Sequence, residues 1–302
     1  MATGARVREI PIPGADHDRV FYLRDAKDVR AIQAQIAPGK RAVIIGGGYI
    51  GLETAASLRK RGLEVTVIEA MDRILQRVTA PIMSDFYRRI HREEGVEIHE
   101  RELAAAIDVE GDHLRVSTTN GTHYVGDFVI VGIGVIPNSD LALAAGLEVE
   151  NGIVAGEFCQ TNDPNIYAIG DVTWHHNPIY DTHLRLESVP NATEQAKTAA
   201  LHICGKPKAY NALPWFWSDQ YDLKLQIAGL SGGYDNIVLR GDPKTSRKIA
   251  AFYFKGDDFL AVDSVNDPRA FMFAKMVLTK GQALDKTVLA DPESDLKAAI
   301  KA

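Results

Sequence analysis

A glycine-rich segment of this 302-residue chain, Gly46-x-Gly48-x-x-Gly51, is the clearest indication of a binding function. In this pattern the first glycine allows a tight turn, the second lets the backbone approach a pyrophosphate, and the third lets a helix pack closely on a strand. The phosphate oxygens can then accept hydrogen bonds from free amides at the helix N-terminus. We therefore expect the three glycines, together with Tyr49 and Ile50 between them, to contact a dinucleotide.

An acidic residue and a nearby arginine bear on which dinucleotide binds. Glu69 follows Gly46 by 23 residues and stands at the end of the next predicted strand, where a carboxylate can bind a ribose 2′-hydroxyl. Because the same carboxylate would repel a 2′-phosphate, we expect NAD(H) rather than NADP(H). Arg73 is close enough in sequence to weaken that preference.

Two other positions are candidates for the NAD(H) site. Glu53 lies two residues after Gly51, near the start of the same predicted helix. It could interact only with the helix dipole, which contributes well under ~1 kcal/mol for an exposed group, or its carboxylate could reach the nicotinamide end of the cofactor. The sequence leaves both open. Gly134 lies in a second glycine-containing turn, after a predicted strand at 128–131, and is expected to line the same site.

Alternating strands and helices must position these residues. The predicted elements are a strand at 42–45, a helix at 49–61, a strand at 64–69, a helix from Pro81 to Gly95 and a strand at 96–99. This order predicts a parallel sheet with helical crossovers. Asn120-Gly121 then indicates an antiparallel hairpin. We expect an α/β fold with a Rossmann-like, three-layer NAD domain over residues 38–135.

Composition and charge limit the classes of protein to consider. Hydrophobic residues make up 46% and charged residues 25% of the chain, which is typical of a globular protein of about two domains. A net charge of -6 without a Lys/Arg-rich block argues against nucleic-acid binding. No apolar run approaches the ~18 residues of a membrane span. With only two cysteines we expect a cytoplasmic protein, and the adjacent His175 and His176 lack suitably spaced partners for a metal site.

A second motif points to another cofactor. Residues 161–171 predict an apolar strand that ends in Gly170-Asp171, which puts a carboxylate at the edge where open α/β sheets bind ligands. Together with the glycine-rich segment, this motif resembles the second flavin-binding motif of the FAD-dependent pyridine nucleotide-disulphide oxidoreductase superfamily. Residues 185–192 and 214–221, the latter beginning Pro-Trp-Phe-Trp-Ser-Asp-Gln, narrow the resemblance to its NADH-dependent ferredoxin reductases. The resemblance extends along the whole chain.

The resemblance implies a set of FAD contacts, which are Arg24, Gly170, Asp171 and Val189. Asp171 would bind the ribityl chain, and Val189 would offer its backbone amide to the pyrimidine edge of the flavin. Reduced flavin carries negative charge near that edge, and the helix predicted over 190–204 directs its positive end there. The implied cofactors are therefore FAD and NAD(H).

The resemblance also implies how electrons move. NADH would dock on residues 46–69 and pass a hydride to nitrogen 5 of FAD, and the reduced flavin would release electrons one at a time to a two-iron two-sulfur ferredoxin. That ferredoxin would serve a cytochrome P450 or a ring-hydroxylating dioxygenase. The flavin supplies the chemistry, so no side chain need act as nucleophile or general acid. Trp215 and Trp217 could stack on the flavin or pack a domain interface, and packing is the simpler expectation.

The implied domain organisation is discontinuous. We expect residues 1–37 and 136–210 to form the remnant of a truncated FAD domain into which the NAD domain is inserted. Residues 211–302 would form a C-terminal α+β reductase domain. Its predicted elements are strands near 223–229, 236–240, 248–255 and 259–265 and a helix near 269–279.

Family members carry another nucleotide-binding half, with its own glycine-rich turn, before the point that matches Ala2-Thr3-Gly4-Ala5-Arg6. The expectation is therefore weak or absent FAD binding by this chain, with NAD binding better preserved. The alternative to an active reductase is a non-catalytic NADH-binding remnant or one half of a split reductase. A homodimer or a complementing N-terminal fragment would then be the partner.

Overall fold

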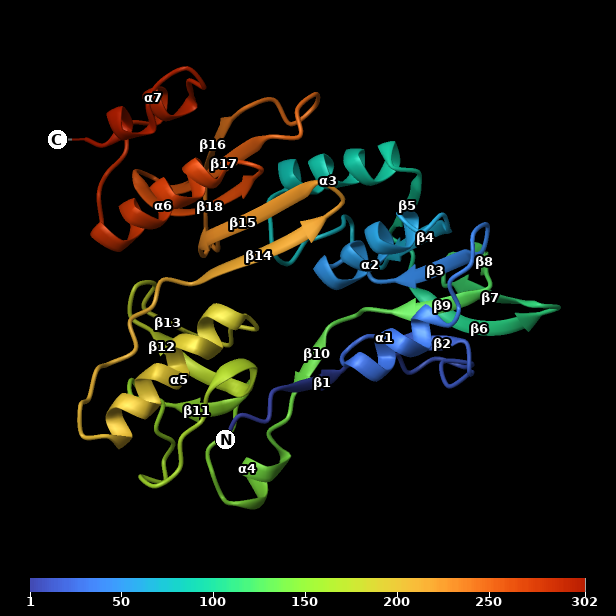
Figure 1. Ribbon diagram of the computed structural model, residues 1–302, viewed down its shortest axis with the longest axis horizontal. Helices are drawn as coiled ribbons and strands as arrows, with labels where there is room; N and C mark the ends of the chain where they lie inside the picture. The colour runs from blue at the N-terminus through green and yellow to red at the C-terminus, as the bar shows by residue number, and fades with distance from the viewer. Residues whose placement is uncertain (302) are drawn as a thin grey trace.

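A computed structural model describes residues 1–301. Its elements gather in three groups (Figure 1): a blue and green group around a parallel sheet, a yellow-green group beside the N-terminus, and an orange and red group at the C-terminus. The longest helix within the described residues has 15 residues, and none is long and apolar enough to cross a membrane.

The first group is built on a five-stranded parallel sheet. Its strands, in spatial order, are β2 (Val20–Tyr22), β9 (Phe128–Val131), β3 (Arg41–Ile45), β4 (Glu64–Glu69) and β5 (Val96–Glu100). The central strands are apolar throughout because both faces of the sheet are covered. Successive side chains of a strand point to opposite faces, so Ile44 packs against one layer and Ile45 against the other.

The two covering layers differ in kind. The Ile44 face packs against two helices, α2 (Tyr49–Arg59) and α3 (Pro81–Glu93). The Ile45 face packs against an antiparallel sheet of β6 (Ala104–Glu110), β7 (His113–Thr118) and β8 (His123–Gly126). The predicted three-layer, Rossmann-like α/β arrangement is confirmed.

One strand of this sheet comes from outside the predicted range of 38–135. β2 pairs in parallel with β9 at the edge of the sheet, and α1 (Ala26–Gln33) follows it. Residues 20–22 therefore hydrogen-bond with the NAD-domain sheet and not with the 136–210 segment with which they were grouped. A strand of three half-buried residues has too little hydrophobic pattern to reveal its partner.

The second group contains residues that precede the parallel sheet in the sequence and residues that follow it. Its elements are β1 (Ala5–Val7), β10 (Val135–Pro137), α4 (Asp140–Ala144), β11 (Ile153–Ala155), the 3-10 helix η1 (Gly170–Val172), β12 (Thr173–Asn177), β13 (Thr182–Leu184) and α5 (Val189–Ile203). β1 and β10 form an antiparallel ribbon. β11, β12 and β13 form a three-stranded sheet.

The strand predicted to end at Gly170-Asp171 does not form. Tyr167 makes one isolated bridge with Gln160, and a 3-10 turn begins at Gly170. The amides of Ala168 and Ile169 donate to carbonyls of two different segments, Cys159 and Met1, so no continuous ladder develops. Local hydrophobicity was misleading because a strand also requires one partner along its whole length.

The third group is an antiparallel sheet covered by helices. Its strands, in spatial order, are β14 (Trp215–Gln220), β15 (Leu223–Gly229), β18 (Asp258–Val265), β17 (Ile249–Lys255) and β16 (Asn236–Arg240), and its helices are α6 (Pro268–Lys280), α7 (Lys286–Ala290) and η2 (Leu296–Ala299). Four of the strands and α6 were predicted. β14 is an additional strand, formed by the aromatic segment that had been given no secondary structure.

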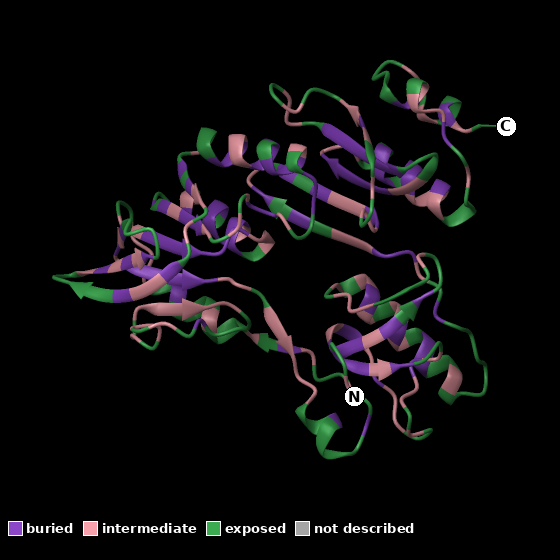
Figure 2. Ribbon diagram, turned by 180° about the vertical axis from the view of Figure 1, so that it is seen from behind, coloured by how far each residue is buried: buried purple, intermediate pink, exposed green. Residues whose placement is uncertain are grey.

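The first and third groups share one hydrophobic core. Buried residues of α2 and α3, such as Leu52 and Phe86, belong to the same cluster as Leu225 and Tyr253 from the C-terminal sheet. The opposite face of that sheet packs on α6 in a second cluster. Figure 2 shows the buried strands in both groups. The C-terminal sheet is therefore held against the helical side of the NAD-binding layers.

Candidate cofactor site

Two glycine turns meet at the carboxyl ends of the neighbouring strands β3 and β9. Gly46 has a φ of +113°, and a Cβ atom there would lie 2.5 Å from the carbonyl oxygen of Gly132. A Cβ atom on Gly51 would lie 2.0 Å from the carbonyl oxygen of Gly46. Side chains at these two positions are excluded by backbone atoms, so both glycines are required for the turns to pack.

The next pair of glycines faces open space. A Cβ atom added to Gly48 or to Gly134 would meet no atom within 4 Å. Gly48 is the N-cap of α2 and caps the helix with no side chain, which leaves the first amides of the helix available. The strand order changes direction here, since β3 lies between β4 and β9, and such a point is where open α/β sheets bind ligands. The turns fit a dinucleotide pyrophosphate.

Glu69 is fixed beside this cradle. Its carboxylate accepts hydrogen bonds from the amides of Gly47 at 2.7 Å and of Met71 at 2.8 Å. A carboxylate offers about four lone-pair sites, so acceptor capacity remains for ribose hydroxyls. Gly47 is a residue that sequence reasoning missed: a Cβ atom there would lie 2.7 Å from Ile74 and 3.2 Å from Glu69 Oε2. The run of three glycines was the available signal.

Arg73, which was expected to weaken the preference for NAD(H), is held elsewhere. Its guanidinium group donates to Ser84 Oγ at 2.6 Å and to the carbonyl oxygen of Gln76 at 3.1 Å. These bonds tie Arg73 to its own loop and to α3. An arginine engaged in this way is poorly prepared to bind a 2′-phosphate.

Tyr49 has only its backbone left for the predicted dinucleotide contact, because its side chain packs against the C-terminal domain. Its ring packs on Phe216 of the C-terminal domain with 5.0 Å between centroids. The hydroxyl is buried and has no hydrogen-bond partner among the described residues, and burial raises the pKa of Tyr49. Ile50, by contrast, is partly exposed at the start of α2.

Glu53 is joined to the C-terminal domain. Ser218 Oγ donates to Glu53 Oε1 at 2.5 Å. Burial raises the pKa of Glu53, the hydrogen bond from Ser218 lowers it, and the nearby Asp219 carboxylate raises it. Glu53 is therefore held by a residue of the C-terminal domain, and its contact with the nicotinamide end of the cofactor stays a prediction.

Two of the expected FAD residues meet in space. Arg24 Nη2 lies 3.4 Å from Asp171 Oδ2, and both side chains are partly exposed. Arg24 follows the carboxyl end of β2, so it stands at the same edge of the parallel sheet as the glycine turns. The structure therefore brings Arg24 and Asp171 together on the side of the sheet where the dinucleotide cradle opens.

The other two expected FAD residues lie on different elements, Gly170 in η1 and Val189 in α5. The Gly170 amide donates to Gln195 Oε1 at 2.7 Å, which ties η1 to this helix. Val189 is the first residue of α5 and is 64% exposed. Ser188 Oγ accepts from the amide of Asn191, and within residues 1–301 the Val189 amide donates to no other group. That amide fits the expected role of a donor to an anionic ring edge.

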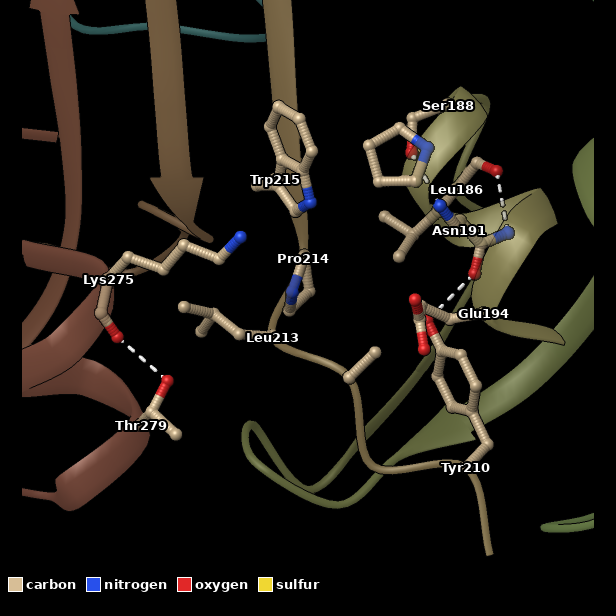
Figure 3. Close-up of a pocket in the computed structure, with 12 residues that line it drawn as sticks. Leu186, Ser188, Asn191, Glu194, Tyr210, Leu213, Pro214, Trp215, Lys275 and Thr279 are labelled. Carbon is tan, nitrogen blue, oxygen red and sulfur yellow. Dashed lines mark hydrogen bonds between the residues drawn. The ribbon is translucent and has the colours of Figure 1, made fainter. Parts of the chain in front are cut away.

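A cavity of about 240 Å³ lies beside α5 and is lined by residues of both neighbouring domains (Figure 3). Trp215 forms part of its wall, with Lys275 Nζ 4.7 Å from its ring and Phe271 at 5.7 Å between centroids. Tyr210 on the opposite side donates to Asn191 Oδ1. Trp215 thus contacts α6 and also faces the cavity beside α5, so packing at the domain interface and stacking on the flavin both stay predictions.

Comparison with known proteins agrees with this geometry. Residues 1–196 match the family described as pyridine nucleotide-disulphide oxidoreductase, and residues 215–300 match the family described as reductase C-terminal. The chain belongs to the pyridine nucleotide-disulphide oxidoreductase family, whose members use FAD and NAD(H).

Individual relatives narrow the class to ferredoxin reductases. The chain is 43% identical to putidaredoxin reductase CamA of Pseudomonas putida, over 100% of this chain and 73% of that protein. It is 40% identical to the ferredoxin–NAD(+) reductase component of the anthranilate 1,2-dioxygenase system of Burkholderia cepacia, over 98% and 73%. A crystal structure of the covalent putidaredoxin reductase–putidaredoxin complex superposes with a TM-score of 0.94 and 43% identity, over 99% of this chain and 74% of that one. The chain is an oxidoreductase of this type.

Proposed function

We propose that the chain transfers electrons from NADH, through FAD, to a ferredoxin. The observation that carries this proposal is the joint arrangement of an open glycine cradle, with Glu69 beside it, and the Arg24–Asp171 pair at the same sheet edge. When bound, FAD supplies the step from two-electron to one-electron transfer. The side chains supply binding, orientation and charge.

The NAD(H) site that we propose contains Gly46, Gly48, Tyr49, Ile50, Gly51, Glu53, Glu69 and Gly134. The backbone amides at the start of α2 bind the pyrophosphate, because the positive end of the helix favours anions. Glu69 accepts from the adenosine ribose hydroxyls and repels a 2′-phosphate. Glu53 accepts from the carboxamide of the nicotinamide.

The FAD site that we propose contains Arg24, Gly170, Asp171 and Val189. Asp171 accepts hydrogen bonds from ribityl hydroxyls, and the Arg24 guanidinium lies beside that carboxylate. The exposed amide of Val189, at the positive end of α5, donates to the pyrimidine edge of the ring. Both helix termini thus stabilise negative charge, one on phosphate and one on reduced flavin.

The electron acceptor that we propose is a two-iron two-sulfur ferredoxin that serves a cytochrome P450 or a ring-hydroxylating dioxygenase. The sequence relatives named for putidaredoxin and for a dioxygenase system support a ferredoxin partner. A ferredoxin accepts one electron at a time, which matches what a flavin can release. We place the reaction in the cytoplasm.

NADH-driven reduction of a two-iron two-sulfur ferredoxin, with FAD added and cytochrome c as the final reporter, tests the proposal. We expect ferredoxin-dependent turnover with NADH that is much faster than with NADPH. Absence of turnover, with NADH binding retained, would instead favour a protein that binds NADH without catalysis.

A further inference from the structure

A line of polar side chains crosses from α3 through the C-terminal domain to Glu53. Tyr221 Oη lies 3.0 Å from His91 Nδ1, and His91 Nε2 lies 2.8 Å from Gln220 Oε1. Gln220 Nε2 donates to Ser218 Oγ at 3.1 Å, and Ser218 Oγ donates to Glu53 Oε1 at 2.5 Å. Five side chains from two domains therefore form one continuous series of hydrogen bonds.

The series has a single direction. Gln220 Oε1 can only accept, so His91 Nε2 must carry the proton, and His91 Nδ1 must then accept from the hydroxyl of Tyr221. Ser218 already accepts from Gln220, which leaves its own proton for Glu53. Every donor thus points toward the Glu53 carboxylate, and hydrogen bonds aligned in this way polarise and strengthen one another.

Burial protects this arrangement from water. His91 is 0% exposed, Gln220 1% and Ser218 2%. Desolvation lowers the pKa of His91 to about 4, so the ring is neutral at physiological pH and holds the one tautomer that the series requires. Water cannot replace the Ser218 hydroxyl at Glu53 without disturbing a packed interface.

We propose that Ser218, on the C-terminal domain, is a positioning residue that holds the Glu53 carboxylate ionised and oriented to accept from the nicotinamide carboxamide, with Gln220 and His91 fixing the direction of the Ser218 hydroxyl. This inference rests on the proposed NADH site. It assigns the C-terminal domain a part in nicotinamide recognition, although the dinucleotide cradle lies entirely on the NAD-binding layers.

The groups that face Glu53 come from three elements. Asp219 on β14 is the nearby anion, and its charge disfavours an ionised Glu53. Tyr49 on α2 and Tyr87 on α3 are buried, burial raises the pKa of both, and both stay neutral. The Ser218 hydroxyl therefore opposes the two influences, burial and Asp219, that would protonate Glu53.

The test is isothermal titration of the full-length chain with NADH between pH 5 and pH 9. Wild-type binding should weaken as the pH falls through the pKa of Glu53, because a protonated carboxyl group lacks the negative charge that strengthens the hydrogen bond from the carboxamide. Ser218→Ala should move that midpoint to a pH higher by about 1–2 units, the effect of one hydrogen bond to a charged group. Glu53→Gln should bind more weakly and lose this pH step.

Three controls separate positioning from a general structural effect. ADP-ribose, which lacks nicotinamide, should bind Ser218→Ala and wild type equally at every pH. Ser57→Ala, at an exposed position on α2, should reproduce the wild-type profile for NADH. Ser218→Thr, which keeps the hydroxyl, should restore the wild-type midpoint. If Ser218→Ala does not fold, Gln220→Leu should give a smaller shift in the same direction.

The inference is overturned if the midpoints of Ser218→Ala and wild type coincide, or if Glu53→Gln keeps the pH step. It is also overturned if ADP-ribose affinity falls in Ser218→Ala as much as NADH affinity. Wild-type protein that binds neither NADH nor ADP-ribose would overturn the proposed dinucleotide site itself, which is a distinct result.

Discussion

Arg24 Nη2 lies 3.4 Å from Asp171 Oδ2, although 147 residues separate them in the chain. Arg24 is the second residue after β2, an edge strand of the parallel sheet, and Asp171 lies in the 3-10 turn η1, which bonds to Gln195 of α5. This ion pair links the sheet edge that carries the glycine turns to the start of α5. The contact shows that residues proposed for the two cofactors lie in neighbouring parts of the molecule.

Replacing Asp171 tests its role in flavin binding. Asp171→Asn keeps the size of the side chain but removes its charge, so we expect FAD affinity to fall by about 10-fold, the effect of one charge-assisted hydrogen bond. Titration of FAD fluorescence measures this change. Asp257→Asn, at a side chain 84% exposed and far along the sequence, is the matched control. Equal affinities for all three proteins would contradict the assignment.

Two glycines of the same turn should respond differently to alanine. Gly46→Ala places a Cβ atom 2.5 Å from a carbonyl oxygen at a φ of +113°, so we expect a loss of about 1–3 kcal/mol in unfolding free energy. Gly48→Ala meets open space and should fold normally but lose NADH binding, because the methyl group occupies the approach of the pyrophosphate. Urea denaturation and NADH titration separate the two effects.

The matched control for the glycine pair is Gly232→Ala, because Gly232 also faces open space and needs no positive φ. It should change neither stability nor binding. Unchanged NADH affinity in Gly48→Ala would show that the open side of the turn is not the pyrophosphate site.

Glu69→Ala should weaken NADH binding by roughly 10- to 100-fold and reduce the preference over NADPH, since an acceptor and a repulsive charge are lost together. NADPH should not become the better ligand, because Arg73 stays bonded to Ser84 and Gln76. Binding constants for both dinucleotides check this, with the exposed Glu97→Ala as control. A clear preference for NADPH would mean that Arg73 leaves its partners.

Asp263 makes stability depend on pH. It is buried at 2% exposure, it accepts from Thr79 and Tyr253, and burial raises its pKa from 3.8 to about 6. Because the folded state binds the proton more tightly than the unfolded state, this group stabilises the fold below pH 3.8. The contribution is lost as the pH rises to about 6.

Asp263→Asn keeps an acceptor without the charge, so at pH 8 it should be more stable than wild type by about 1–3 kcal/mol. The difference should shrink as the pH falls toward 4. Urea unfolding at several pH values measures it, with the exposed Asp257→Asn as reference. A destabilised Asp263→Asn at pH 8 would mean that the ionised carboxylate contributes more than its burial costs.

The local parts of the proposed dinucleotide site could be predicted from the sequence. Glycines at 46, 48 and 51 between an apolar strand and a helix, with an acid at the end of the next strand, correspond to β3, α2 and β4. The periodicity of hydrophobic residues and the residue preferences of turns extend over a few positions only, so they can be recognised in the sequence without knowing the fold. The hairpins, α3, α5 and most of the C-terminal strands were predicted for the same reason.

Other features depended on contacts between distant segments. The pairing of β2 with β9, the failure of a strand to form before Gly170, and the strand β14 all depend on which partner is available for backbone hydrogen bonds. The residues near each segment do not indicate which strand it pairs with, because strand formation depends on the tertiary context.

The tertiary structure alone decided how the candidate side chains are used. Glu53 accepts a hydrogen bond from Ser218, and Arg73 donates one to Ser84. The ring of Tyr49 packs on Phe216 at the domain interface. A residue's type and spacing determine what chemistry it can offer, and these followed from the sequence by itself. The hydrogen-bond partner of each side chain depends on packing between the domains. A buried polar group must form a hydrogen bond, and only the fold determines which groups lie beside it.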